Sequence, residues 1–341
     1  MNYPKTILVL RFSSIGDIVQ TTSVIGTLKK NFPDTLIDFM TLSKYSSLLN
    51  KHPYINNIYE VDIKANYKDL KSISYEMNAL KYDLVLDLHN TTRSKIIRKF
   101  IKNSEKRYIR KPRWKRFKNY VFHLNQFPKE FSVRSWMNGT IDDLINEENN
   151  PSKTKLFISK EEKIKSKKFI HSRGAINPFF VILPGAAWPQ KTWLFERYVT
   201  VIKKCVENYN LTPLLVGNSS DIICNRIKDT FGKNLIDIHG ETSLRESIAI
   251  ISQSEFVIGS DTGLVHAAEG LDIPAISILG PTTKETGAGV FNKKSVTVED
   301  TNLWCRPCSQ NGSIPCYRKK QYCMTNIDVE DVMNAVKRVM Q

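Results

Sequence analysis

The sequence predicts an α/β protein made of two doubly wound domains with parallel sheets. Short, continuous apolar runs alternate with helix-like stretches along the chain, a pattern typical of parallel strands buried on both faces between helices. The 341 residues exceed what a single hydrophobic core usually supports. A polar stretch at residues 147–168 separates the apolar runs into two sets, so two Rossmann-like domains are expected.

The expected domains cover residues 1–160 and 170–327. The apolar runs predict strands in chain order at residues 7–10, 36–41, 58–61 and 84–88 in the first domain, and at residues 179–183, 213–216, 256–258 and 275–279 in the second. Residues 146–155 are poor in apolar side chains and are interpreted as the connector. Apolar positions at helical spacing in residues 328–340 predict an amphipathic C-terminal helix.

The composition is that of a globular protein in water, with 41% hydrophobic and 25% charged residues. No apolar run approaches the roughly 18 residues that a membrane-spanning helix needs. The N-terminus has no basic region followed by an apolar one, so no signal peptide is predicted and a cytoplasmic location is expected.

The formal net charge of +16 suggests a polyanionic partner. Residues 93–118 hold 13 lysines and arginines with one acid, Glu105, and aromatic residues lie between these bases. The alternative interpretation is a solvated helical face beside a loop. Zinc-finger spacing and RNP-type motifs are missing from the sequence, so nucleic acid is not expected and a membrane surface or phosphorylated glycolipid is favoured.

Polar motifs follow the ends of predicted strands, where open α/β sheets bind ligands. The run Gly259-Ser260-Asp261 passes directly into a predicted helix beginning at residues 262–264. Backbone N–H groups and the helix dipole at such a start favour phosphate, and Asp261 and His266 can frame the site. The alternative is an ordinary junction whose polar side chains only cap the helix.

The first predicted strand ends in a second motif, Arg11-Phe-Ser-Ser-Ile-Gly16-Asp17. Gly16 allows the backbone to approach a ligand closely. The dipole keeps Asp17 ionised, and an ionised carboxylate can act as a general base toward a sugar hydroxyl. The alternative is that Asp17 is only an acid at a helix N-terminus. The motif lacks the GxGxxG pattern of dinucleotide-binding dehydrogenases.

Two further residues of the second domain are candidates for phosphate contacts. Lys191 follows a loop rich in Gly, Ala and Pro and can neutralise a leaving phosphate, unless it is a solvated surface lysine. Thr282 follows the turn Gly280-Pro281 and can donate to phosphate or cap a helix.

Four of the six cysteines cluster near the C-terminus. They are Cys305, Cys308, Cys316 and Cys323. Such clustering in a cytosolic chain favours a structural metal, and four thiolates suit zinc or iron. The alternatives are reduced thiols and disulfides.

Together these motifs resemble glycosyltransferase family 9, the bacterial lipopolysaccharide heptosyltransferases. The matching segments are residues 7–17, residues 83–90 with Arg93 and Ser94, residues 183–187 with residues 191–193, residues 259–268, residues 280–282, and the cysteine tail. The resemblance extends over nearly the whole chain, with residues 93–135 matching only in general character.

The resemblance implies a GT-B fold, two Rossmann-like domains that face each other across a cleft, with helix 328–341 packing back on the first domain. It implies an ADP-heptose donor on the second domain and a phosphorylated Kdo–lipid A or inner-core acceptor on the first. No cofactor or metal is expected for the chemistry.

Residue roles follow from the resemblance in the same way. Asp17 would be the catalytic base, and Lys191 would stabilise the leaving diphosphate. The expected donor contacts are Asp261, Thr262, Gly263, Leu264, His266 and Thr282. The expected acceptor contacts are Arg11, Ser13, Ser14, Gly16 and Arg93.

Three alternatives stay open at the level of sequence. The enzyme could use another nucleotide sugar, such as an N-acetylhexosamine donor. It could modify protein, because its cysteine tail resembles heptosyltransferases that act on autotransporters and carry iron. It could also be a non-enzymatic polyanion-binding protein. The expected location is cytoplasmic, peripheral at the anionic surface of the inner membrane.

Overall fold

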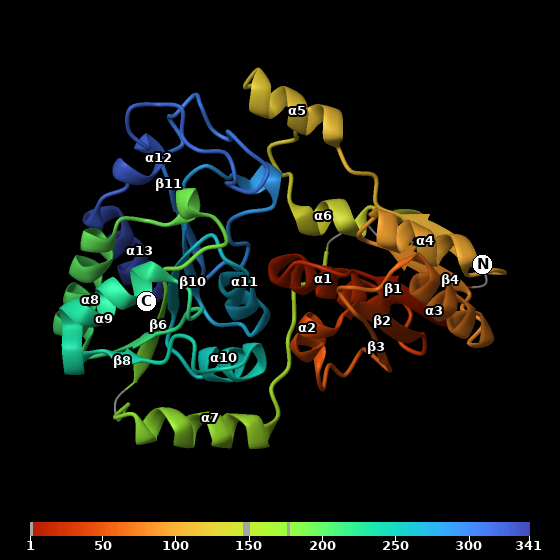
Figure 1. Cartoon of the computed structure of the whole chain (residues 1–341), viewed down its shortest axis with the longest axis horizontal. Coiled ribbons are helices and arrows are strands. Elements are labelled where there is room, and N and C mark those ends of the chain that lie inside the picture. The colour runs from red at the N-terminus through yellow and green to blue at the C-terminus, as the bar shows by residue number, and fades with distance from the viewer. Residues whose placement is uncertain (1–2, 146–150, 176–177) are drawn as a thin grey trace. The chain divides into compact units, whose positions relative to one another are not determined.

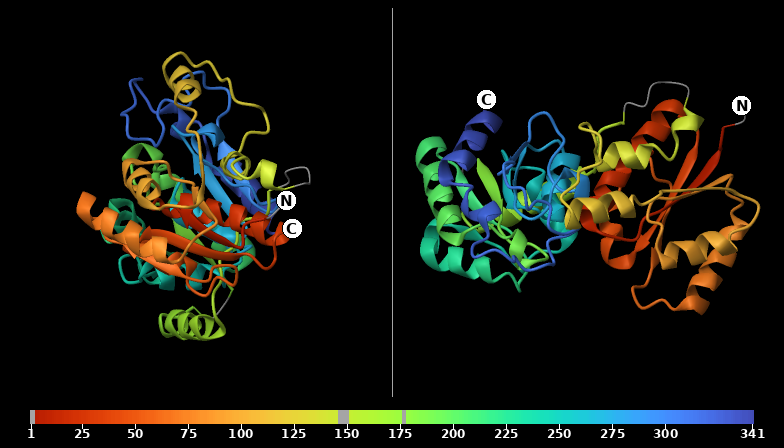
Figure 2. Two further views of the ribbon diagram at one scale, coloured as in Figure 1. Left: turned by 90° about the vertical axis from the view of Figure 1, so that its right-hand side faces the viewer. Right: turned by 90° about the horizontal axis from the view of Figure 1, so that it is seen from above.

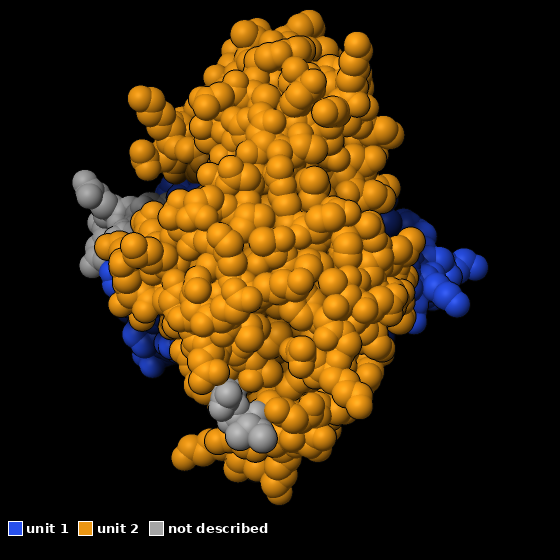
Figure 3. Space-filling model, turned by 90° about the vertical axis from the view of Figure 1, so that its left-hand side faces the viewer, with its two compact units in different colours: residues 1–112, 132–157 blue, residues 113–131, 158–341 orange. Residues whose placement is uncertain are grey.

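The computed structural model describes residues 3–145, 151–175 and 178–341. The chain divides into two compact units, which Figure 3 marks by colour. Unit 1 contains Met1–Pro112 and Ser132–Phe157, and unit 2 contains Arg113–Phe131 and Ile158–Gln341.

Unit 1 alternates strands and helices from its start. Its strands are β1 (Thr6–Leu10), β2 (Leu36–Leu42), β3 (Ile58–Val61), β4 (Leu84–Asp87) and β5 (Glu105–Tyr108). Its helices are α1 (Ile15–Asn31), α2 (Ser43–Ser46), α3 (Tyr67–Ala79), α4 (Thr92–Phe100) and α6 (Val133–Asn138), with 3₁₀ turns at Ser47–Leu49 and Asp142–Leu144.

Unit 2 repeats the pattern. Its strands are β6 (Phe179–Leu183), β7 (Thr212–Leu215), β8 (Ile236–Asp237), β9 (Val257–Ser260), β10 (Ala275–Leu279) and β11 (Val296–Glu299). Its helices are α5 (Arg113–Val121), α7 (Lys160–Ser172), α8 (Phe195–Tyr209), α9 (Ile222–Phe231), α10 (Leu244–Ile251), α11 (Gly263–Gly270), α12 (Tyr322–Thr325) and α13 (Val329–Val339). Its 3₁₀ turns are Pro189–Lys191, Gly232–Asn234 and Lys284–Thr286.

Both sheets are parallel and have the strand order of a Rossmann fold. The order in unit 1 is β3-β2-β1-β4-β5, and β1 pairs in parallel with both β2 and β4. The order in unit 2 is β11-β10-β9-β6-β7-β8, which is the same arrangement extended by one strand. In each sheet the order reverses beside the first strand, between β1 and β4 and between β6 and β9.

Helices cover both faces of each sheet, as Figures 1 and 2 show for the two units separately. Alternate residues of β6 belong to different cores: Phe180 and Ile182 pack with α8, α9 and α13, whereas Phe179, Val181 and Leu183 pack with α10 and α11. A strand buried on both faces has no polar side to show in its sequence, which explains the continuous apolar runs. The predicted α/β class with two doubly wound units is therefore confirmed.

The eight strands predicted from apolar runs are all present. Three strands were missed, and each has a physical reason. Strand β5, Glu-Lys-Arg-Tyr, lies at an edge of its sheet and is charged rather than apolar. Strand β8 is two residues long. Strand β11 is an edge strand that alternates valine with polar residues.

The segment 113–131 groups with unit 2, whereas the sequence-based boundaries include it in the first domain. Side-chain contacts hold it there. The Tyr120 hydroxyl donates to Gln310, and Asn125 Nδ2 donates to Glu285 Oε1 at 3.0 Å. These partners lie about 160 to 190 residues away in the sequence, so no local sequence pattern indicates that the segment belongs to unit 2.

The connector predicted at residues 146–155 falls partly outside the described residues, which exclude 146–150. Its described end contacts α1, where Ser152 N donates to Thr27 Oγ1 at 3.1 Å and Lys155 N donates to Thr22 Oγ1 at 2.9 Å. Threonine side chains of α1 thus hold the chain as it leaves unit 1.

Helix α13 confirms the amphipathic C-terminal helix as an element. Its apolar face, including Val332 and Val336, packs within unit 2 against α8, β10 and β11. The expectations that this helix packs on the first domain and that the domains face each other across a cleft stay predictions. No helix within the described residues is long and apolar enough to span a bilayer.

A buried hydrogen bond ties the strand ends of unit 1 together and is open to test. The Tyr82 hydroxyl donates to Asp38 Oδ2 at 2.6 Å, and Asp38 Oδ1 accepts from the Asn57 backbone and side chain at 3.0 Å each. We expect Tyr82→Phe to lower the free energy of unfolding by about 1–2 kcal/mol, because the buried Asp38 carboxylate loses one of its hydrogen-bond donors. Urea denaturation measures this loss.

The control is Tyr75→Phe, because the Tyr75 side chain is 52% exposed and only its ring contacts Phe100. Equal unfolding free energies for the two variants would show that the buried hydroxyl contributes nothing.

Candidate functional site

The polar motifs of both units lie where the strand order reverses. In unit 1 the motif that begins at Arg11 follows β1, and His89 follows its neighbour β4. In unit 2 the loop that begins at Pro184 follows β6, and Asp261 follows its neighbour β9. Ligands of open α/β sheets bind in the crevice at such points. Each unit therefore carries its own candidate site.

Arg11 organises the site of unit 1. Its guanidinium is buried and donates to the carbonyl oxygens of Ser13 at 2.8 Å and of Leu88 at 2.5 Å. Its remaining nitrogen forms an ion pair of 2.6 Å with Asp17 Oδ2. One side chain thus connects the end of β1, the end of β4 and the first turn of α1.

Asp17 has two roles that one carboxylate can combine. It lies at the third position of α1 and completes a capping box with Ser14, whose backbone N–H and hydroxyl donate to Oδ2 at 3.1 and 3.0 Å. The capping interpretation of the sequence is therefore correct as far as it goes. The Asp17 side chain is also 39% exposed, so the carboxylate remains accessible from solvent.

The electrostatics keep Asp17 ionised. Partial burial raises the pKa of Asp17, but the Arg11 guanidinium and the hydrogen bonds from Ser14 outweigh this effect, so its pKa lies below the usual value. A carboxylate with a lowered pKa is unprotonated throughout the physiological range and can accept a proton from a bound hydroxyl.

His89 is a neighbour that sequence reasoning missed as a site residue. Its Nδ1 accepts from the Phe12 backbone N–H at 3.3 Å, and burial together with the positive charge of Arg11 lowers the pKa of His89 to about 3. The ring is therefore neutral at physiological pH. The signal that could have found it is its position directly after β4, beside the strand that carries Arg11.

Asp87, the last residue of β4, holds the turn that contains His89. Its Oδ1 accepts from the backbone N–H groups of His89 and Asn90 at 3.0 and 2.7 Å, and its Oδ2 pairs with Arg98 at 3.0 Å. This fully buried carboxylate positions the strand end and does not reach a ligand.

The other residues expected at the acceptor site lie in the same region with different exposure. Ser13 is half-buried, Ser14 is exposed and Gly16 is buried in the first turn of α1. Arg93, in α4, is half-buried, donates to the Ile63 carbonyl at 2.8 Å and lies 5.9 Å from the Phe12 ring centroid.

The site of unit 2 joins three strand ends through one carboxylate. Lys191 Nζ forms an ion pair of 2.6 Å with Asp261 Oδ2, and Thr282 Oγ1 donates to the same oxygen at 2.9 Å. All three side chains are largely buried, with Lys191 13% and Asp261 9% exposed. Residues from the loops after β6, β9 and β10 are thereby brought together. The sequence placed each of them after a predicted strand but did not show which of them are in contact.

Helix α11 begins beside this cluster. Its N-cap Thr262 is extended and its helical residues start at Gly263, so the strand β9 passes into the helix within two residues. Thr262, Gly263 and Leu264 are partly exposed, whereas His266, one turn on, is buried. The first N–H groups of a helix have no intrahelical partner and attract anions.

Arg306 braces the loop that carries Thr282, and sequence reasoning missed it. Its guanidinium is 4% exposed and donates to the carbonyl oxygens of Gly280, Thr282 and Asp300, the last two at 3.0 and 2.5 Å. It also pairs with Glu299 at 2.6 Å. The local sequence, Cys-Arg-Pro-Cys, does not predict that this arginine contacts a loop about 25 residues earlier in the chain.

The cysteine-rich segment also contacts Lys191. A Cβ at Gly312, whose φ is +80°, would lie 2.5 Å from Lys191 Cγ, so only glycine allows this approach. Gln321 Nε2 donates to the carbonyl oxygen of Gln190. The tail therefore limits where the Lys191 side chain can lie.

The four clustered cysteines line one small pocket of about 20 Å³ together with Tyr317 and Tyr322. They are free thiols, with Cys305 and Cys323 buried, Cys308 half-buried and Cys316 exposed. Burial raises the pKa of Cys308, and it raises that of Cys323 to about 11, so both stay protonated. Across the described residues, no three His, Cys, Asp or Glu side chains are arranged to hold a metal ion. The expected structural zinc or iron is therefore unsupported.

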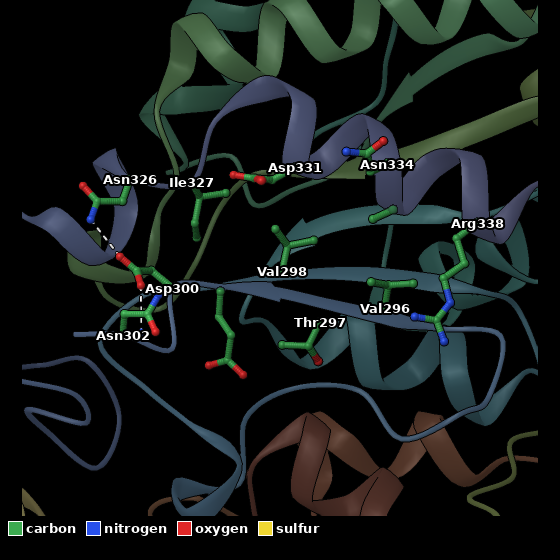
Figure 4. Close-up of a pocket in the computed structure, with 12 residues that line it drawn as sticks. Val296, Thr297, Val298, Asp300, Asn302, Asn326, Ile327, Asp331, Asn334 and Arg338 are labelled. Atoms are coloured by element: carbon green, nitrogen blue, oxygen red, sulfur yellow. Dashed lines mark hydrogen bonds between the residues drawn. The ribbon is translucent and has the colours of Figure 1, made fainter. Parts of the chain in front are cut away.

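A separate pocket of about 570 Å³ lies between β11 and α13 (Figure 4). Three of its polar residues bond to one another: Asn326 Nδ2 donates to Asp300 Oδ2 at 2.7 Å, and Asn302 N donates to Asp300 Oδ1 at 2.9 Å. Glu299, which pairs with Arg306, also lines it. None of the residues expected at the donor site faces this pocket, so it is not part of that site.

Comparison with known proteins finds relatives that align over nearly the whole chain. Residues 71–317 match the sequence model of a family described as glycosyltransferase family 9 (heptosyltransferase). Lipopolysaccharide heptosyltransferase 1 of Campylobacter coli is 24% identical over 351 aligned positions, covering 98% of each chain. That share of the chain includes residues 11–17, which precede the family match.

Solved structures share the fold over the same length. A glycosyltransferase family 9 protein from Veillonella parvula has a TM-score of 0.78 at 19% identity and covers 98% of this chain and 97% of its own. The E. coli ADP-heptose LPS heptosyltransferase II has a TM-score of 0.75 at 19% identity and covers 98% of both chains. The GT-B fold class expected from the sequence is thereby confirmed.

The brace at Arg306 makes a local prediction. We expect Arg306→Lys to lower the free energy of unfolding by about 2 kcal/mol, because one ammonium cannot replace a buried guanidinium with four oxygen partners. Amide hydrogen exchange should accelerate at residues 280–283, where the lost contacts lie. Exchange measured by mass spectrometry, with urea denaturation, checks both effects.

The matched control is Arg226→Lys, because the Arg226 side chain is 55% exposed and pairs with Glu196 at 3.2 Å. Arg306 does not support the loop if both variants exchange at the wild-type rate at residues 280–283.

Proposed function

The chain belongs to glycosyltransferase family 9, and we propose that it transfers heptose from ADP-heptose to the inner core of lipopolysaccharide. The names of its relatives support this donor and acceptor class, because they are lipopolysaccharide heptosyltransferases from several bacteria. The observation that carries the proposal is the buried cluster of Lys191, Asp261 and Thr282 beside the start of α11. Such a cluster would supply a leaving diphosphate with a cation and N–H donors.

In the proposed donor complex the diphosphate of ADP lies at the start of α11. The N–H groups of Thr262, Gly263 and Leu264 donate to its oxygens, assisted by the helix dipole. An ammonium has three donors, so Lys191 can keep its bond to Asp261 and still donate to phosphate. Asp261 would thus orient Lys191 while Thr282 and His266 complete the donor site. Negative charge grows on the diphosphate as the sugar leaves, and preorganised donors stabilise that charge.

In the proposed acceptor complex Asp17 is the base. An acceptor hydroxyl oxygen attacks the anomeric carbon, the bond from that carbon to the phosphate oxygen breaks, and the configuration inverts. The hydroxyl proton goes to Asp17, and the electron pair of the broken bond goes to ADP. A lowered pKa makes Asp17 a weak base, but the proton becomes acidic as the new bond forms, so a weak base accepts it late in the step.

The residues around Asp17 would share the remaining work. Arg11 holds the carboxylate and keeps it ionised, so we assign Arg11 a positioning role before any contact with the acceptor. Neutral His89 can exchange hydrogen bonds with sugar hydroxyls at physiological pH. Arg93, with Ser13, Ser14 and Gly16, would bind the phosphorylated part of the acceptor. Because the acceptor is a glycolipid, the enzyme would work in peripheral contact with the anionic inner-membrane surface.

The base assignment predicts the behaviour of one isosteric variant. We expect Asp17→Asn to lower the transfer rate by about 10²–10⁴-fold, because the amide cannot take the proton. Binding of ADP-heptose, measured by calorimetry, should change little. Transfer is measured with a heptose-free Kdo–lipid A acceptor.

Asp69→Asn is the matched control. Asp69 occupies the same third position of a capping box, at the start of α3, so this variant loses the same structural contact without touching the site. Equal losses of transfer in the two variants would mean that Asp17 only caps its helix.

The donor assignment predicts a selective loss of nucleotide affinity. We expect Lys191→Met to weaken ADP binding by about tenfold, because a charge-assisted contact to phosphate is lost. Lys191→Arg should retain part of the affinity. Calorimetry is carried out at a temperature where circular dichroism shows both variants folded, since Lys191→Met also leaves Asp261 without its buried partner.

Lys203→Met, at an exposed position of α8, is the control for removal of a lysine. Unchanged ADP affinity in Lys191→Met would remove Lys191 from the site. Stabilisation of the wild type against heat by UDP-N-acetylglucosamine in place of ADP-heptose would instead identify another donor class.

A further inference from the structure

Helix α5 exposes its apolar face to solvent. The side chains of Trp114, Phe117 and Val121 are 77%, 46% and 52% exposed, and they recur at the spacing that places residues on one side of a helix. Phe122 and Leu124 continue the surface at 59% and 56% exposure. We call these five residues the α5 patch. Single exposed apolar residues are ordinary, but a contiguous group indicates a surface that something covers.

The sides of α5 away from this stripe contact the rest of unit 2. Asn119 is 3% exposed, and Tyr120 donates to Gln310 of unit 2. At about 100° per residue, Asn119 lies nearly opposite the centre of the stripe formed by Trp114, Phe117 and Val121. A helix that packs on a core turns its apolar side inward, and α5 does the reverse.

The patch is continuous through ring contacts within unit 2. The Trp114 ring lies 5.9 Å from that of Phe117, which lies 6.0 Å from that of Phe122. The next residue, His123, contacts the Trp304 ring at 5.1 Å, and Trp304 is 62% exposed. Exposed aromatic rings from two distant segments therefore adjoin.

Positive charge surrounds the stripe. Arg113, Lys115 and Lys118 are exposed on α5, and Arg113 and Lys118 fall at the two borders of the stripe on the helical projection. Within the unit 2 segment, residues 113–129 hold five lysines and arginines and no acidic residue. A surface of this kind attracts an anionic partner without local repulsion.

We propose that the α5 patch docks the enzyme on an anionic phospholipid bilayer, an inference that rests on the proposed function because a glycolipid acceptor lies in such a surface. Aromatic and aliphatic side chains enter the boundary between headgroups and acyl chains, while the flanking bases contact anionic headgroups. Tryptophan is enriched at that depth. A second copy of the chain fits less well, because its own cations would face these across the interface.

Vesicle flotation tests the proposal with the full-length protein. We expect the wild type to bind vesicles rich in phosphatidylglycerol and not vesicles of phosphatidylcholine alone, with binding reduced by salt. Trp114→Ser/Phe117→Ser should lower the partition coefficient by about tenfold or more. Lys115→Glu/Lys118→Glu should lower it to a similar extent only on anionic vesicles.

Two matched controls make the same kinds of substitution at exposed positions outside the α5 patch. Lys167→Glu/Lys168→Glu makes the same charge change on exposed positions of α7, and Ile222→Ser removes an apolar side chain that is 75% exposed on α9. Both controls should bind vesicles like the wild type. The proposal is overturned if the wild type ignores anionic vesicles, if the patch variants bind like the wild type, or if the controls lose binding equally.

The function and the docking surface can fail separately. With a deacylated, water-soluble core acceptor, the patch variants should transfer heptose at the wild-type rate, and with an acceptor embedded in vesicles they should be slower. If the wild type transfers heptose to neither acceptor, the proposed function is refuted, and the result of the vesicle-binding experiment still stands. A concentration-dependent dimer in sedimentation equilibrium that Trp114→Ser/Phe117→Ser abolishes would assign the patch to self-association and overturn docking on lipid.

Discussion

When the strand order of a parallel sheet reverses, the connections on either side leave on opposite faces, and a crevice opens between the strand ends. The candidate residues that follow β1, β4, β6 and β9 depend on this constraint. It separates the loop after β1 from that after β4 in unit 1, and the loop after β6 from that after β9 in unit 2. Side chains far apart in sequence meet there because the strands that carry them are hydrogen-bonded neighbours. Lys191 and Asp261 are 70 residues apart and in contact for this reason.

Each crevice contains a cation–carboxylate pair held by further hydrogen bonds. Removing charges from water is costly, and attraction between partners repays that cost only when the geometry is good. The pairs of Arg11 with Asp17 and of Lys191 with Asp261 are both 2.6 Å long and have additional donors on the carboxylate. Because desolvation offsets much of the attraction within each pair, stability alone does not account for the two ion pairs. In the proposed function, both pairs would fix charged groups before the substrates arrive.

The sequence allowed the prediction of whatever depends on local pattern. Buried strands such as β6 were found because both faces are apolar, and the motifs at Asp17 and Asp261 were found because strand ends and helix starts have characteristic residues. The charged edge strand β5 escaped because its stability comes from pairing with β4.

Long-range contacts account for what sequence reasoning missed in the sites. Arg306 supports a loop some 25 residues earlier, and His89 acquires its neutral state from burial beside Arg11. The assignment of α5 to unit 2 rests on partners such as Gln310. The cysteine spacing suggested a metal, but spacing does not specify how four thiols are oriented in space.

The chain passes from one unit to the other at three places, after residues 112, 131 and 157. Neither unit is a single continuous piece of sequence. A single cut in the chain therefore cannot separate the two units. A recombination event near residue 157 would deliver a new C-terminal half together with an α5 segment inherited from the old chain. The contacts of Tyr120 and Asn125 with Gln310 and Glu285 would then have to match across two lineages. An exchange of this half therefore keeps these contacts only when the α5 segment and the segment around Gln310 fit each other.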